Sequence, residues 1–158
     1  MRSKKFAALV PLMLLTGGSA AAAGSVTGSA ALALAGVVAP NSPYLSSAER
    51  RAVAAFFAGN DAPGNRKISV TADKIVCRIS DVDITARSCE LTFKKTTRSL
   101  KGRAANELYA TAVFAGVPSD GAAGSIFESV AKLNCTLDPK QLRDKGGGGA
   151  ECSYEAPN

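Results

Sequence analysis

The chain has 158 residues, the length of a single domain, and carries 19 Lys and Arg against 13 Asp and Glu, a formal net charge of +6. It contains no histidine, so it lacks the commonest general base and the commonest metal ligand of proteins. This composition excludes Ser-His-Asp and Cys-His nucleophilic catalysis and favours a protein that is not an enzyme.

The N-terminus has the three parts of a secretory signal peptide. Basic residues within 1–5 precede an apolar run at 6–15, and small residues follow as far as Ala23. The apolar run is half the length of about 20 residues that crosses a bilayer. We therefore predict a cleaved signal peptide at residues 1–23 and a bacterial protein of the periplasm or the medium. The alternative is an uncleaved anchor that continues through the apolar run at 30–39, which a proline ends.

Cleavage would remove three basic residues and no acid, so the mature chain of residues 24–158 has a net charge of +3. This charge does not indicate nucleic-acid binding. Residues 24–45 are rich in Ala, Gly, Ser and Pro and predict a loosely ordered arm that has room for a short helix. The remaining residues, 46–158, form the predicted domain.

Two helices are predicted in this domain. The first covers residues 48–57 and begins with a capping box, in which Ser46 and Glu49 each satisfy an amide of the other. The second covers residues 103–115. Their apolar spacing predicts inward faces formed by Val53, Phe56 and Phe57 in the first helix and by Leu108, Tyr109, Ala112 and Val113 in the second.

The segment at 67–101 predicts β structure, because apolar residues alternate with polar ones. A loop at 80–88 divides it into the two arms of a hairpin. Further along, the spacing of apolar residues predicts a short helix at 124–132, followed by a strand at 133–137. A mobile excursion with a glycine run (138–149) then leads to a closing strand at 150–155.

The four cysteines are Cys77, Cys89, Cys135 and Cys152. An even number of cysteines in a small exported domain indicates two disulfides. The alternative, a four-cysteine metal site, expects Cys-x-x-Cys pairs, which the sequence does not contain. Sequence alone allows three pairings. We favour Cys77–Cys89 and Cys135–Cys152, because each pair then staples one predicted hairpin.

A short internal repeat supports this pairing. The residues around Cys77 (KIVCRI, 74–79) align with those around Cys135 (KLNCTL, 132–137), and each segment leads into a polar loop and a second cysteine. The similarity indicates either a duplication or the pattern that any two strands with a central cysteine would share.

A basic stretch without an acid lies between Leu91 and Glu107. Its cations are Lys94, Lys95, Arg98, Lys101 and Arg103. Such a stretch is typical of an anion-binding edge or of a solvated edge strand whose lysines prevent pairing with other chains. Only Phe93 lies beside these cations, which argues against single-stranded nucleic acid as the partner.

Two further interpretations involve enzymes. A hydrolase would use Asp73, Asp81 and Asp83, although the sequence shows no carboxylate pair at the separation that glycoside hydrolysis needs. An inhibitor of an exported enzyme would present the disulfide-held loop at 80–88, because a rigid loop loses little entropy on binding.

These observations predict an α+β fold, in which two or three helices pack on antiparallel sheet that contains two disulfide-stapled hairpins. The favoured function is a non-catalytic binding or structural module of the cell envelope, with an envelope protein or an anionic envelope component as its partner. The inhibitor and the carboxylate hydrolase are the alternatives. No cofactor, metal site or catalytic residue is assigned.

Overall fold

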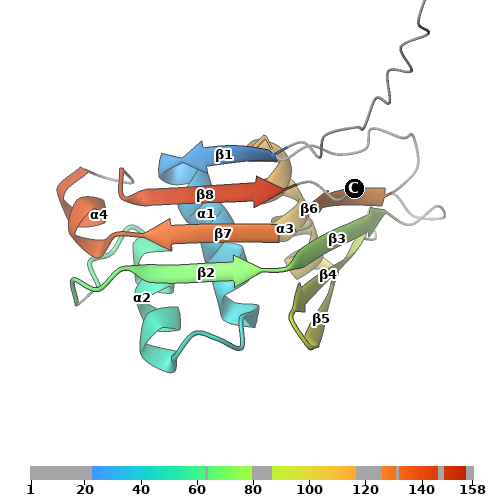
Figure 1. Ribbon diagram of the computed structural model, residues 1–158, viewed down its shortest axis with the longest axis horizontal. Helices are drawn as coiled ribbons and strands as arrows, with labels where there is room; N and C mark the ends of the chain where they lie inside the picture. The colour runs from blue at the N-terminus through green and yellow to red at the C-terminus, as the bar shows by residue number, and fades with distance from the viewer. Residues whose placement is uncertain are drawn as a thin grey trace, which may run out of the picture.

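The computed structural model describes residues 23–62, 64–79, 87–116, 126–130, 132–145 and 148–155 (Figure 1). The predicted signal peptide lies outside these residues except for Ala23. The described residues form an α+β fold of two four-stranded antiparallel sheets and four α-helices, as the sequence predicts for the fold class. The two predicted hairpins belong to different sheets.

The first sheet has the order β1-β8-β7-β2 and the second sheet the order β5-β4-β3-β6. The strands of the first sheet are β1 (Ala23–Thr27), β8 (Ala150–Glu155), β7 (Lys132–Leu137) and β2 (Ile68–Ala72). Those of the second are β5 (Thr96–Lys101), β4 (Arg87–Phe93), β3 (Lys74–Ile79) and β6 (Ile126–Val130). All neighbouring strands are antiparallel.

Helices cover one side of the sheets (Figure 1). Helix α1 (Gly28–Val38) packs on the first sheet, α3 (Arg103–Phe114) packs on the second, and the two helices contact each other. Helix α2 (Ser47–Phe57) follows a short 3-10 turn, η1 (Ala39–Asn41), and lies against α1. Helix α4 (Pro139–Lys145) follows β7 and precedes β8 in the chain. One hydrophobic core joins both sheets and the helices.

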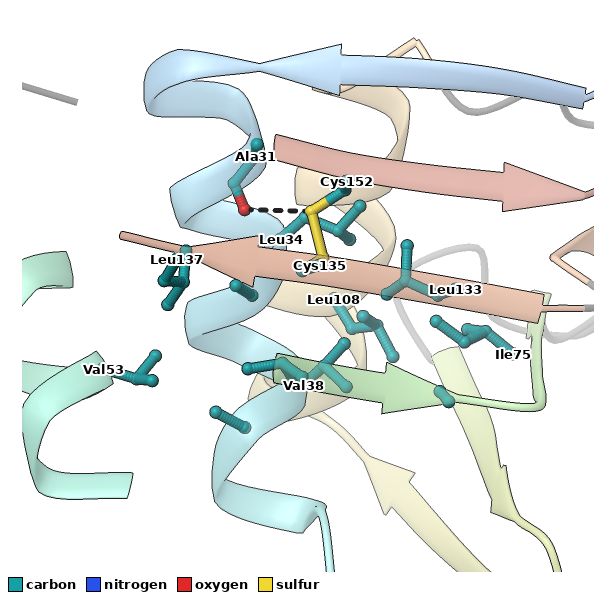
Figure 2. Close-up of a cluster of buried hydrophobic side chains, with 14 of the residues drawn as sticks. Ala31, Leu34, Val38, Val53, Ile75, Leu108, Leu133, Cys135, Leu137 and Cys152 are labelled. Atoms are coloured by element: carbon teal, nitrogen blue, oxygen red, sulfur yellow. Dashed lines mark hydrogen bonds between the residues drawn. A yellow bond between two sulfur atoms is a disulfide. The ribbon is translucent and has the colours of Figure 1, made fainter. Parts of the chain in front are cut away.

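The predicted loosely ordered arm at 24–45 is wrong. These residues form β1, α1 and η1, and α1 is central to the core, with Ala31, Leu34 and Val38 no more than 1% exposed (Figure 2). The small residues of α1 are what allow close packing. A Cβ at Gly36 would lie 2.8 Å from the Phe57 ring, so glycine permits α2 to approach α1.

Two further local predictions are also wrong. The predicted short helix at 124–132 contains β6, which pairs with β3. The predicted mobile excursion at 138–149 contains α4, whose first turn is capped by the Asp138 carboxylate. In the first case, pairing with a neighbouring strand outweighs a local pattern that fits a helix equally well.

The helices at 48–57 and 103–115 are confirmed with shifts of one residue at their ends. Val53, Phe56, Leu108 and Ala112 are buried as predicted. The prediction fails for Phe57 and Val113, which are 52% and 50% exposed. Each lies in the last turn of its helix, beside a buried neighbour (Phe56 or Ala112).

Two carboxylates at helix N-termini have lowered pKa values. The backbone N–H of Ser46 donates to the Glu49 carboxylate at 2.8 Å in the predicted capping box, and this hydrogen bond is the main reason why the pKa of Glu49 lies below its ordinary value. At α4, the backbone N–H of Gln141 donates to Asp138 at 3.3 Å and lowers the pKa of that carboxyl in the same way. A charged carboxylate is the form that such N–H donors favour.

We expect the Glu49→Gln/Asp138→Asn variant to lose less stability in acid than the unchanged protein. The folded-state pKa of each carboxyl is below the ordinary value of 4.5 or 3.8. The stabilisation is therefore complete above that value and is lost as the pH falls through the lower, folded-state pKa. Thermal unfolding between about pH 6 and about pH 2 measures the difference. Glutamine preserves the capping geometry, so parallel pH profiles for the two proteins would contradict the prediction.

Candidate functional site

Both predicted disulfides are confirmed. Cys77 pairs with Cys89 across β3 and β4, and Cys135 pairs with Cys152 across β7 and β8. In each hairpin the two cysteines are directly opposite in the ladder, so each bridge staples one hairpin as predicted. Both bridges are fully buried, and none of the cysteines is free. The alternative of a four-cysteine metal site is therefore wrong.

The predicted anion-binding edge is not continuous in the structure: Lys94, Lys95 and Arg98 lie at or near one turn, and Lys101 lies apart from them. Lys94 and Lys95 form the turn between β4 and β5, and Arg98 follows on β5 opposite Leu91. Lys101 lies at the other end of β5, which at about 3.4 Å per residue places it roughly 20 Å from the turn. It also points to the opposite face of the sheet from Arg98, because successive residues alternate.

Arg103 does not join either group as a free cation. It begins α3, and its Nε donates to Glu107 Oε1 at 2.7 Å. This hydrogen bond raises the pKa of Arg103 and pairs its charge with an acid one helical turn away. We call the remaining group, Tyr44 with Lys94, Lys95 and Arg98, the basic tip.

Tyr44 belongs to the basic tip because the fold brings it from the loop before α2. The Lys94 ammonium lies 5.4 Å from the centre of the Tyr44 ring, a cation–π distance. The same ring packs edge-on against Phe93, with centroids 6.5 Å apart. Half of Tyr44 stays exposed, so the tip presents an aromatic ring among three exposed cations.

The backbone of the tip is fixed in an unusual conformation. Lys94 has a φ of +49°, the left-handed region, where turns normally place Gly or Asn. Its N–H donates to the carboxylate of Asp73, at the bend between β2 and β3. A non-glycine residue held at positive φ costs on the order of 1 kcal/mol or more, and such strain concentrates at functional sites.

Tyr44 was not predicted as a site residue from the sequence. It lies 50 positions before Lys94 in the chain, and no local pattern links the two. Phe93 was the only aromatic residue expected near the cations. The contact arises from packing of the η1–α2 loop over the inner face of β4, which only the tertiary structure defines.

Of the three carboxylates in the hydrolase alternative, the structure describes Asp73. Asp73 accepts the Lys94 N–H and donates its own N–H to the Thr92 carbonyl at 2.8 Å, so it shapes the turn. Asp81 and Asp83 lie outside the described residues. So does most of the inhibitor loop at 80–88, of which Arg87 and Ser88 belong to β4.

Surface hollows among the described residues are small. One lies between α1, α2 and α4, with a volume of about 250 Å³ and apolar walls that include Leu32, Phe56 and Leu142. Two others have volumes of about 170 and 270 Å³. Pockets that enclose a small molecule are commonly 300–1,000 Å³, and these three hollows are smaller.

Two features are absent from the described residues. In that part of the chain, no group of three or more Cys, Asp or Glu side chains is arranged to hold a metal ion. No helix there has the length and apolar character needed to cross a membrane.

The sequence matches no protein-family model, and comparison with curated proteins and with solved structures finds no match. The candidate site therefore rests on its geometry.

Proposed function

We propose that this chain is an exported, non-catalytic module of the bacterial cell envelope whose basic tip binds phosphate groups at an anionic membrane surface. Two observations support export: the signal-like sequence at 1–23 and two buried disulfides, which persist in oxidising compartments. Cleavage after Ala23 would remove only one residue of β1, so the β1–β8 pairing would remain from Gly24 onward.

The observation that carries the proposed binding function is the strained turn at Lys94. A lysine is held at positive φ where glycine would carry no strain. Its ammonium lies within cation–π distance of the neighbouring Tyr44 ring. Tyrosine has an apolar body and a polar tip suited to the membrane interface, and each basic residue near an anionic surface contributes about 1 kcal/mol.

The test compares binding of residues 24–158, oxidised, to vesicles of phosphatidylglycerol and of phosphatidylcholine. The three-residue variant Lys94→Gly/Lys95→Gln/Arg98→Gln removes the tip cations. With three contributions of about 1 kcal/mol each, we expect its affinity for phosphatidylglycerol to fall about 100-fold. Binding of the unchanged protein should weaken with added salt, because exposed charges are screened.

A matched control removes three cations beside the first sheet instead of the second: Arg66→Gln/Lys67→Gln/Lys140→Gln. Arg66 and Lys67 precede β2, whose start lies near α4 (Figure 1), and Lys140 belongs to α4. The net charge of this control equals that of the tip variant, so an equal loss of affinity would show a general charge effect and would contradict a defined site. The Lys94→Gly change should not lower the melting temperature, because glycine relieves the strain. Mass spectrometry of the protein exported by a bacterial host should give an N-terminus at Gly24, within a few residues.

A further inference from the structure

Two segments of the chain each resemble a later segment, and both alignments have no gap. Residues 25–34 (SVTGSAALAL) and 99–108 (SLKGRAANEL) are identical at five of ten positions. Residues 68–79 (ISVTADKIVCRI) and 126–137 (IFESVAKLNCTL) align without a gap and share isoleucine, lysine and cysteine. The second pair extends the short repeat around Cys77 and Cys135 in the N-terminal direction.

The same segments occupy equivalent places in the fold. In both, an edge strand (β1 or β5) leads through a glycine with positive φ into a helix (α1 or α3), at Gly28 with φ +71° and at Gly102 with φ +57°. The aligned helix residues are buried alike, at no more than 1% exposure. They are Ala31, Leu34 and Val38 in α1 and Ala105, Leu108 and Ala112 in α3.

The edge strands β1 and β5 meet the hairpins in the same register. Val26 of β1 is opposite Cys152 of β8, and its counterpart Leu100 of β5 is opposite Cys89 of β4. The other edge strands also pair alike, β2 with β7 and β6 with β3, both antiparallel. Their registers coincide at Ala72–Leu133 and Val130–Ile75, and beyond the bulge after Ile75 the β6–β3 register is offset by one residue. The two sheet orders, β1-β8-β7-β2 and β5-β4-β3-β6, are therefore the same arrangement built twice.

A contact between the disulfides and the helices also recurs. The Sγ of Cys152 lies 3.4 Å from the Ala31 carbonyl oxygen of α1 (Figure 2), and the Sγ of Cys89 lies 3.5 Å from the Ala105 carbonyl oxygen of α3. A disulfide sulfur carries no hydrogen, so these are sulfur–oxygen packing contacts. Ala31 and Ala105 are at matching positions of the two repeats.

We infer that the chain is two copies of one β-α-β-β-β unit that have exchanged their disulfide-stapled hairpins. The first unit is residues 23–93 and the second is 96–155. The first sheet takes its edges, β1 and β2, from the first unit and its central hairpin, β7–β8, from the second. The second sheet takes β5 and β6 from the second unit and the hairpin β3–β4 from the first.

The exchange of hairpins makes the two units depend on each other, because neither sheet can form without strands from both units. Helix α1 of the first unit packs on the hairpin of the second, and α3 of the second unit packs on the hairpin of the first. The protein should therefore show one global unfolding transition, while local opening of each hairpin depends on the helix that covers it. The turn at Lys94–Lys95 is the junction between the units, and its equivalent is the gap between Glu155 and Ala23, which are opposite each other in the β1–β8 ladder.

Hydrogen exchange in the full chain tests the crossed packing. The variants Ala31→Val and Ala105→Val each add volume to a fully buried helix position. We expect Ala31→Val to speed amide exchange about tenfold more in β7–β8 than in β3–β4, and Ala105→Val to do the reverse. If each variant instead loosened the hairpin of its own unit (β3–β4 for Ala31→Val and β7–β8 for Ala105→Val), the proposed swap of hairpins would be wrong.

A circular permutant tests the unit boundary and does not depend on those variants. It opens the chain between Lys94 and Lys95 and joins Glu155 to Ala23 through four residues, the number that separates Thr92 from Thr97 in the equivalent β4–β5 connection. We expect it to form the same two disulfides and to unfold in one transition, within a few degrees of the melting temperature of the original chain. Mispaired cysteines or two separate transitions would overturn the duplication.

Discussion

Replacing Cys135 and Cys152 by alanine is expected to lower the free energy of unfolding by about 3 kcal/mol. The bridge joins residues 17 apart. It stabilises the fold mainly by lowering the conformational entropy of the unfolded chain. The Cys77–Cys89 bridge joins residues 12 apart. The Cys77→Ala/Cys89→Ala variant should lose a similar free energy of unfolding, since loop entropy changes only logarithmically with length. Removal of all four cysteines should cost about 6 kcal/mol, comparable with the roughly 5–15 kcal/mol that holds a domain folded.

Urea unfolding followed by circular dichroism measures these losses, with mass spectrometry to confirm the remaining bridge in each double variant. Reduced unchanged protein is the control, because it loses the covalent constraint but keeps the cysteine side chains. We expect it to behave like the four-alanine variant. A loss of less than about 1 kcal/mol in either double variant would show that its hairpin is fixed by the helix and the core without the bridge.

Truncation of Leu34 should have a similarly large effect. Leu34 is 1% exposed and lies on α1 against the first sheet, beside the Cys135–Cys152 bridge (Figure 2). Leu34→Ala leaves a cavity in a close-packed core, so we expect a loss of about 3 kcal/mol. For a domain of this size, such a loss lowers the melting temperature by roughly 10 °C.

The matching variant on α3, Leu108→Ala, should lose a similar free energy, because Leu108 is equally buried at the equivalent position. Val113→Ala is the control on the same helix, since Val113 is 50% exposed and surface truncations usually change stability by less than about 0.5 kcal/mol. Calorimetry on the three variants gives the comparison. Equal losses for Leu34→Ala and Val113→Ala would show that α1 is not part of the core.

The cysteine hairpins could be predicted from sequence because their information is local. Alternation around Cys77 and Cys89 puts both sulfurs on one face of adjacent strands, and the short loop between them leaves antiparallel pairing as the simplest closure. The helix at 48–57 was predictable for the same reason, since its capping box lies within four residues.

The role of α1 could not be predicted because composition does not reveal what a segment packs against. Residues 28–38 are apolar on nearly all sides, which fits a flexible Ala-rich arm, the end of an export signal or a fully buried helix. The structure selects the last of these, because α2, α3 and the first sheet surround the helix. Residues 126–130 posed a similar ambiguity, which the open edge of β3 resolved in favour of a strand.

The sequence by itself determined the α+β class, the two bridges and the local caps, because each depends on spacing along a short stretch of chain. Only the tertiary structure decided that the two hairpins belong to opposite sheets, that α1 lies in the core and that Tyr44 reaches Lys94. These features depend on contacts between residues far apart in the chain. Such contacts are chosen by the total burial and strand pairing of the whole fold, which no local pattern encodes.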